Sequence, residues 1–260
     1  VGLRVAGFDE DVRAAASSGV RTVGSLQRLA QECELALVAL DGDQAATVIE
    51  QIIEQPGSLE SIALCGALDP RRVQELATAA KGIALLDAPL DGGEETIEMG
   101  RAVIFAGGAS TSVDSCRGVL EPLGAVIRVG DVGAGQIART ANDLLRCASV
   151  LAIHDAFNLV RAAGGDPSAV REAVLRASGS NRALEEWGRA TVSAAQQDIE
   201  AALLLARETG ASIPFVERLQ ELIAEIDSEQ LSGLFNLGIV DLSKPQDPLA
   251  EGEEFEPELS

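Results

Sequence analysis

Hydrophobic positions in the first half of the chain form short apolar runs that alternate with amphipathic stretches. The run at 35–40 is continuously apolar, which is typical of a strand buried on both faces of a parallel sheet. Ser25 and Pro70 stand where helices would begin, as an N-cap and a first-turn proline. The pattern predicts strands at 3–8, 21–23, 35–40, 62–65, 83–87, 103–106 and 126–129. It predicts helices at 11–18, 25–33, 43–54, 70–80 and 112–120, and a loop at 87–93. This alternation predicts an α/β fold built on a doubly wound parallel sheet.

The apolar period changes to that of helices after Gly133. One segment, 133–163, has apolar residues at three- and four-residue steps, and Gly164 supplies a stop signal. Further helices are expected at 167–177, 182–193, 195–209 and 214–228. We therefore expect an α/β domain at 1–130 and an all-α domain at 131–240. Residues 241–260 are acidic and poor in large apolar groups, which predicts a disordered tail.

Composition and charge argue against several classes of function. The chain has 260 residues, 47% of them apolar, and a formal net charge of −21. This charge argues against general binding to nucleic acid or anionic membranes, so small molecules or proteins are the expected partners. No apolar run is long enough to span a bilayer, and no signal peptide is seen. The four cysteines are far apart and favour free thiols in the cytoplasm, and the single histidine, His154, argues against a metal site.

The long helix predicted at 133–163 has a polar face as well as an apolar one. Gln136, Arg139, Asn142, Asp143 and Arg146 are spaced three or four residues apart, so they share one side of the helix. This face is a candidate site. The alternative is ordinary surface chemistry, because Arg139 and Asp143 also have the spacing of an exposed helical ion pair.

Several motifs, in order along nearly the whole chain, resemble the β-hydroxyacid dehydrogenase family of 3-hydroxyisobutyrate and 6-phosphogluconate dehydrogenases. Residues 133–143 are similar to its interdomain helix motif G-x-G-x-x-x-K-x-x-N-N, with Asn142 in place and Arg139 at the lysine position. Residues 87–93 resemble its D-A-P-V-S-G-G substrate loop, and 100–108 resemble its G-x-L-x-x-x-x-G-G. Residues 7–9 resemble the end of its second Rossmann strand, and Gln197-Asp198 its K-D pair.

The resemblance implies a Rossmann-like domain followed by a helical domain that binds substrate and forms a homodimer. It implies NAD(P)-dependent hydride transfer on a small carbonyl, hydroxy acid or imine. The resemblance implies catalytic roles for Arg139 and Asn142. It implies that the substrate is bound by Asp91, Gly92, Gly93 and Asn142. It implies that the cofactor is bound by Asp9, Leu40, Asp41, Ala67, Gln197 and Asp198. Because Asp9 is followed by Glu10, NAD is favoured over NADP, whose 2′-phosphate two carboxylates would repel. The alternative for Asp9 is an exposed residue at a turn.

The chain also departs from the family pattern. It begins at what would be the second strand, without the G-x-G-x-x-G turn that receives the pyrophosphate. We therefore expect either an incomplete N-terminus or another closure of the sheet, for which 234–242 is a candidate. In the cleft, Arg139 and Gln197 replace lysines, Asp91 replaces a serine, and 64–67 lacks the usual hydroxyls.

Two accounts of function follow from these departures. The first is a divergent oxidoreductase in which Arg139 orients or polarises the substrate, because a guanidinium cannot shuttle a proton. In this first account, Asp91 or Asp198 donates or accepts the proton, or forms an ion pair with a cationic amine. The second is a non-catalytic relative that serves as a dimerising or regulatory subunit, beside a catalytic paralogue. His154 and Trp187 are interpreted as structural residues in both accounts.

Overall fold

The computed structural model describes residues 4–9, 20–186 and 192–225. The chain divides into two compact units between Asn142 and Asp143. The expected helix at 11–18, Trp187, the candidate segment at 234–242 and the acidic tail all lie outside the described residues.

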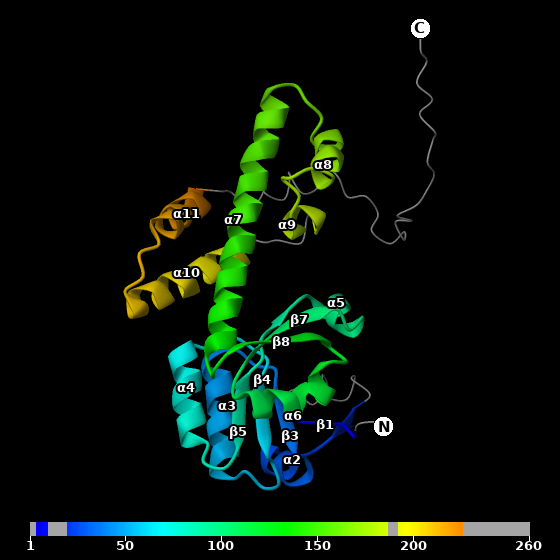
Figure 1. Cartoon of the computed structure of the whole chain (residues 1–260), viewed down its shortest axis with the longest axis vertical. Coiled ribbons are helices and arrows are strands. Elements are labelled where there is room, and N and C mark those ends of the chain that lie inside the picture. The colour runs from blue at the N-terminus through cyan, green and yellow to red at the C-terminus, as the bar shows by residue number, and fades with distance from the viewer. Residues whose placement is uncertain (1–3, 10–19, 187–191, 226–260) are drawn as a thin grey trace. The chain divides into compact units, whose positions relative to one another are not determined.

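The first unit is built on strands that are mostly parallel (Figure 1). Its strands are β1 (Ala6–Gly7), β2 (Arg21–Thr22), β3 (Leu35–Val38), β4 (Ser61–Leu64), β5 (Ala84–Asp87), β6 (Leu90–Asp91), β7 (Ala102–Gly107) and β8 (Gly124–Gly130). β3, β4 and β5 pair in parallel, β7 runs antiparallel to β5 and β6, and β8 runs parallel to β7. β1 and β2 form a separate two-stranded parallel sheet. Among the described strands β3 pairs only with β4, so one edge of β3 has no partner strand there.

Helices cover both faces of the larger sheet and create two cores. The helices are α2 (Leu26–Glu32), α3 (Gly42–Glu54), α4 (Pro70–Ala79), α5 (Glu94–Glu98) and α6 (Ser110–Leu120). α2, α3 and α4 pack on one face with Ile62 and Leu64, whereas α6 packs on the other with Ala63 and Leu86. Figure 1 shows α3 and α4 side by side, away from α6. Neighbouring residues of β4 thus enter opposite cores, which explains why its sequence is continuously apolar.

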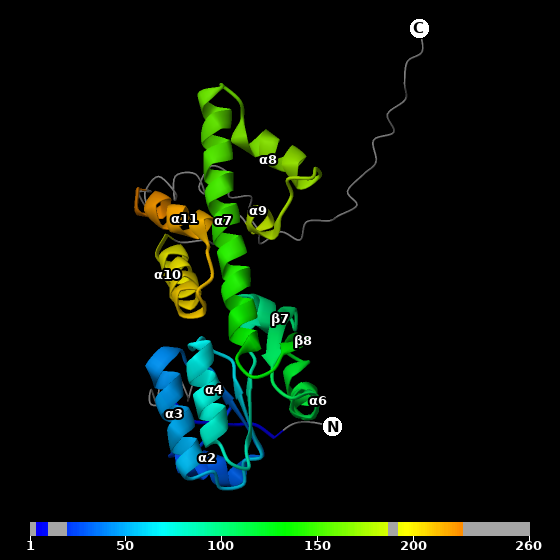
Figure 2. The same cartoon turned by 60° about the vertical axis from the view of Figure 1, so that its left-hand side comes forward.

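The second unit is helical and is organised around the long helix α7 (Ala134–Ala162), which begins in the first unit. Its other helices are α8 (Pro167–Leu175), α9 (Arg182–Glu185), α10 (Val192–Thr209) and α11 (Pro214–Glu225). Figure 2 shows α10 and α11 on one side of α7, with α8 and α9 on the other. Cys147 and Leu151 of α7 pack against α10 and α11, while Phe157 packs against α8 and α9.

Most predicted elements form, and the exceptions are short. Ser25 caps α2 by accepting from the backbone N–H of Arg28, and Asp69 caps α4 just before Pro70. The predicted loop at 87–93 contains β6, and α5 was not predicted. The helix predicted at 182–193 begins at Arg182 as expected, but α9 ends at Glu185, and residues 187–191 lie outside the described part of the chain. The antiparallel direction of β7 was not predicted either, although the sheet is rich in parallel strands as expected.

Candidate active site

The predicted substrate loop contacts the start of α7. Asp91 ends β6, and Nδ2 of Asn142 donates to its Oδ1 at 3.3 Å. Gly92 has φ +134°, a conformation that favours glycine, and Gly93 caps α5. Arg139 is half-buried and lies three residues before Asn142 on the same side of α7. The structure therefore brings Asp91, Gly92, Gly93 and Asn142 together and puts Arg139 one turn away on the helix.

A buried carboxylate, Asp87, fixes where α7 begins, and the sequence analysis did not assign it a role. Asp87 ends β5 and has no exposed surface. Its Oδ1 accepts from the backbone N–H of Gly133 at 2.7 Å, and its Oδ2 accepts from that of Gln136 at 2.8 Å. Burial raises the pKa of Asp87, and these two backbone hydrogen bonds oppose that rise by stabilising the carboxylate.

Gln136 is a second buried polar residue at the same helix start. Its Nε2 donates to the carbonyl of Gly66 at 2.8 Å, and its Oε1 accepts from the backbone N–H of Leu68 at 3.2 Å. Only 3% of Gln136 is exposed, so its side chain lies among the backbone groups of the loop after β4. The first turn of α7 is therefore held by both β5 and the loop after β4.

Three predicted cofactor residues meet at the carboxyl ends of β3 and β4. The backbone N–H of Ala67 donates to Oδ1 of Asp41 at 2.5 Å, and the N–H of Gly42 donates to the carbonyl of Ala67 at 2.7 Å. A Cβ on Gly66 would lie 1.9 Å from the carbonyl oxygen of Leu40, so this approach requires glycine. Leu40, Asp41 and Ala67 are therefore neighbours, with one oxygen of Asp41 engaged in joining the two loops.

A cavity of about 550 Å³ lies beside the edge of β3 and contains two predicted cofactor residues, Asp9 and Leu40. Asp9 follows β1 and Leu40 follows β3, so residues after two different strands line the same cavity. Phe8 is 37% exposed and Leu40 is 38% exposed, so the wall is partly apolar and open to solvent. Its size falls within the range of about 300–1,000 Å³ typical of small-molecule sites.

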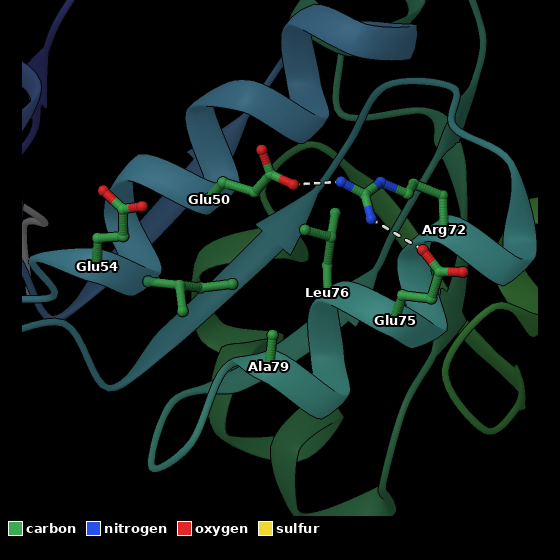
Figure 3. Close-up of a pocket in the computed structure, with 7 residues that line it drawn as sticks. Glu50, Glu54, Arg72, Glu75, Leu76 and Ala79 are labelled. Atoms are coloured by element: carbon green, nitrogen blue, oxygen red, sulfur yellow. Dashed lines mark hydrogen bonds and ion pairs between the residues drawn. The ribbon is translucent and has the colours of Figure 1, made fainter.

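A smaller hollow of about 290 Å³ lies between α3 and α4 and contains no predicted site residue. Figure 3 shows Arg72 between the carboxylates of Glu50 and Glu75, with which it forms ion pairs, while Glu54 lies farther along α3. In the described part of the chain, no group of His, Cys, Asp or Glu side chains is arranged to hold a metal ion. This hollow is therefore a surface feature of two packed helices, and we do not treat it as a ligand site.

The last two predicted cofactor residues, Gln197 and Asp198, lie on α10 in the second unit. Gln197 is exposed. Oδ2 of Asp198 lies 2.6 Å from NH2 of Arg146, and that guanidinium also lies 3.7 Å from Asp143. Burial raises the pKa of the neighbouring Cys147 thiol to about 11, and the negative charge of Asp198 adds to the rise. Within the second unit, Asp198 thus joins α10 to α7.

Some expectations about composition can also be compared with the structure. All four cysteines are free thiols; Cys116 and Cys147 are buried, whereas Cys33 and Cys65 are partly buried. Among the helices that the structure describes, none is both long and apolar enough to cross a bilayer.

Comparison with known proteins identifies related families and folds. Residues 1–133 match the profile of the NAD-binding domain of 6-phosphogluconate dehydrogenase, and 133–240 match that of the NAD-binding region of NADP-dependent 3-hydroxyisobutyrate dehydrogenase. The 2-(hydroxymethyl)glutarate dehydrogenase of Eubacterium barkeri is 26% identical over 197 residues, 71% of this chain and 64% of the relative. The 3-hydroxyisobutyrate dehydrogenase of Pseudomonas aeruginosa is 34% identical over 123 residues, 46% of this chain and 41% of the relative.

A solved structure shows the same fold at low identity. The structure of Mycobacterium tuberculosis 3-hydroxyisobutyrate dehydrogenase with L-serine superposes with a TM-score of 0.72 at 19% identity, covering 86% of each chain. The matched regions span less than two thirds of the length of the curated relatives named above. The two profiles together cover residues 1–240. The chain therefore belongs to the β-hydroxyacid dehydrogenase family.

Proposed function

We propose that this chain is a divergent NAD(P)-dependent oxidoreductase that transfers a hydride between the cofactor and a small carbonyl, hydroxy acid or imine. The observation that carries this proposal is the cavity beside β3, because Asp9 and Leu40 line it from the ends of different strands. In parallel α/β sheets, ligands bind outside the carboxyl ends of the strands. Membership in the dehydrogenase family supports the same interpretation.

The residues around this cavity have the chemistry to hold a dinucleotide. The carboxylate of Asp9 accepts hydrogen bonds from ribose hydroxyls, and Leu40 supplies an apolar wall. Asp41 joins the loop after β3 to the loop after β4 by accepting from the backbone N–H of Ala67. When bound, a nicotinamide supplies or accepts the hydride, and the chain provides binding, orientation and electrostatics.

On the substrate side, Asn142 and Asp91 form a hydrogen-bonded pair, with Arg139 one turn away on α7. The guanidinium of Arg139 donates hydrogen bonds and stabilises negative charge on a substrate oxygen. It does not act as a general acid or base, because it stays protonated in proteins. Asn142 orients the substrate through the part of its amide that does not bond Asp91. Proton transfer is assigned to Asp91, whose carboxylate lies beside Asn142.

Titration of the whole chain with NADH and NADPH, followed by nicotinamide fluorescence, tests cofactor binding directly. We expect saturable NADH binding in the micromolar range and weaker NADPH binding, because Asp9 is followed in sequence by Glu10 and two carboxylates would repel a 2′-phosphate. Asp9→Asn should narrow the difference between the two cofactors. Equal affinity for both would refute the NAD preference. No binding at millimolar cofactor by folded protein would overturn the proposed function.

The second candidate function is a non-catalytic subunit of the same family, and Arg139 is the residue that favours it. A panel of small carbonyls and imines, assayed with the cofactor that binds, separates the two accounts. We expect turnover by the unmodified chain, and a pH profile that changes when Arg139→Lys introduces a group able to exchange protons. Cofactor binding without turnover on any panel member, by the unmodified chain and by Arg139→Lys, would favour the subunit.

We further propose that the chain forms a homodimer through its helical part. Leu145 and Leu159 on α7 are 70% and 71% exposed, and Phe215 on α11 is 64% exposed. The two leucines are about four helical turns apart and so lie on a similar side of α7. Exposed apolar groups of this size are typical of interaction surfaces. Light scattering during gel filtration should give twice the chain mass, and Leu145→Lys with Leu159→Lys should give the monomer; a monomeric unmodified chain refutes the proposal.

A further inference from the structure

Asp87 is a buried ionisable residue to which the proposed function gives no part. It is fully buried at the end of β5, four residues before Asp91. Its two carboxylate oxygens accept from different residues of one segment, Oδ1 from Gly133 and Oδ2 from Gln136. A buried carboxylate is costly unless hydrogen bonds compensate its desolvation, so this arrangement holds the α7 start firmly in place.

The space around this carboxylate depends on glycines from two other segments. A Cβ on Gly107 would lie 2.3 Å from Oδ1 of Asp87, and a Cβ on Gly135 would lie 2.7 Å from Oδ2. Gly107 belongs to β7 and Gly135 to the first turn of α7. Strand β7, helix α7 and strand β5 therefore meet closely at Asp87, and a residue with a side chain at either glycine would displace the carboxylate.

Two lengths of chain that carry substrate residues begin at this junction. One runs from Asp87 to Asp91, and the other runs from Gln136 along less than two turns of α7 to Asn142. They meet again where Asn142 donates to Asp91 at 3.3 Å. A shift of α7 relative to β5 at Asp87 would therefore move Asn142 relative to Asp91. Displacements of this kind cost catalytic rate even when they arise away from the reacting atoms.

We propose that Asp87 is a positioning residue for the substrate site: its carboxylate joins the start of α7 to β5 and thereby sets Asn142 against Asp91. The inference rests on the proposed function for its catalytic consequence. Its structural consequence, the coupling of the loop at 88–93 to the helix start at 133–142, stands independently of any cofactor or substrate.

Asp69 provides a matched control, because it is also an aspartate that accepts from two backbone N–H groups at a helix start. Its Oδ1 accepts from Arg71 at 2.8 Å and from Arg72 at 3.2 Å, at the start of α4. Asp69 differs in that it is only partly buried and in that both of its partners belong to the helix it caps. Replacing Asp69 therefore removes a helix cap alone, whereas replacing Asp87 removes a connection between separate segments.

Hydrogen–deuterium exchange of the full chain tests the coupling. In Asp87→Asn one carboxylate oxygen becomes an NH2 group, which cannot accept from the backbone N–H that faced that oxygen. We therefore expect exchange to accelerate about tenfold or more in both 88–93 and 133–142. In Asp69→Asn we expect acceleration only near the start of α4. Acceleration in Asp87→Asn that is confined to 133–142, or that spreads equally over the whole first unit, would overturn the proposal.

A second measurement uses the unmodified chain and so does not depend on whether the variant folds. Native-state exchange at increasing urea should show 88–93 and 133–142 opening together, with the same dependence on urea. Separate opening of the two segments would overturn the coupling. These exchange experiments need no ligand, so their result is distinct from a failure of the proposed function, which appears as absent cofactor binding.

The catalytic consequence is tested once a substrate is found. Asp87→Asn should lower kcat about tenfold or more while the dissociation constant for NADH changes less than about twofold, because Asp87 acts on the substrate side. Asp69→Asn should leave both constants close to those of the unmodified chain. A parallel loss of kcat and cofactor affinity in Asp87→Asn would show a general structural defect and overturn the positioning role.

Discussion

Gln136→Leu is the substitution whose effect follows most directly from the structure. Leucine has a similar size but removes both side-chain hydrogen bonds, to the carbonyl of Gly66 and from the N–H of Leu68. Both of these backbone groups are buried, and each buried group left without a partner costs about 1–3 kcal/mol. We therefore expect a loss of roughly 2–6 kcal/mol, a large part of the 5–15 kcal/mol typical of a folded domain.

Urea unfolding followed by circular dichroism measures this loss. The control is Gln74→Leu, which removes one exposed hydrogen bond from Nε2 to the carbonyl of Val132 and should cost less than about 1 kcal/mol. Gln136→Leu should lower the unfolding midpoint much more than the control. A change in unfolding free energy below about 1 kcal/mol, with an unchanged urea dependence, would refute the claim that Gln136 satisfies buried backbone groups at the start of α7.

Three further predictions concern cysteines and glycines. Burial raises the pKa of Cys65 to about 12, and burial together with the Asp198 charge raises that of Cys147 to about 11. Both thiols should label far more slowly at pH 8 in the native chain than in urea, as measured by mass spectrometry. The ordinary thiol pKa is 9.0, so above about pH 9 these thiols ionise in the unfolded chain before they ionise in the folded one. The free energy of unfolding should therefore fall as pH rises from about 9 to 12, which urea denaturation at each pH measures. Gly66→Ala should lower the free energy of unfolding by about 1–3 kcal/mol or more, and with it the thermal midpoint, because its Cβ would overlap the carbonyl of Leu40. Gly118→Ala, inside α6 with open space around it, should raise the free energy of unfolding by about 0.5–1 kcal/mol, and with it the midpoint. Equal midpoints for the two glycine variants, or equal labelling in native and unfolded chains, would contradict these expectations.

The sequence predicted the elements whose formation depends on local pattern. Residues 35–38 and 61–64 form strands, where 35–40 and 62–65 were predicted, because continuous apolar runs suit a sheet covered on both faces. Ser25 caps α2 as predicted, because its side chain reaches a nearby backbone N–H group, and Asp69, for which no cap was predicted, caps α4 in the same way. β6 and α5 were not predicted, because a strand of two residues and a helix of five residues are too short to show a hydrophobic period.

The site was only partly predictable, for a different reason. The contact between Asp91 and Asn142 is consistent with the family motif, which assigns both residues to the substrate. Asp87 was given no role of its own, and Gln136 was named only as part of the polar face of the long helix, because the burial of both depends on backbone groups of segments remote in sequence. Gln136 has the spacing of a polar-face residue, yet its amide lies among Gly66 and Leu68. The spacing of residues along a helix predicts which of them share a face. Whether that face is exposed depends on the segments that pack against it, which the spacing does not show.

Asp198 was predicted to bind the cofactor, but it also forms a structural ion pair between α10 and α7. Its carboxylate forms an ion pair with Arg146 at 2.6 Å, with 19% of the Asp198 side chain exposed. The Arg146 side chain is 37% exposed, so the pair is partly buried. Removing one partner leaves the other charge partly desolvated without its counter-charge, so Asp198→Asn alone should weaken the packing of α10 on α7. A loss of cofactor binding in that variant would therefore not identify Asp198 as a cofactor ligand. The comparison that does so is Arg146→Met, which breaks the same ion pair while keeping the Asp198 carboxylate: if Asp198 binds the cofactor, Arg146→Met retains more affinity than Asp198→Asn at equal stability.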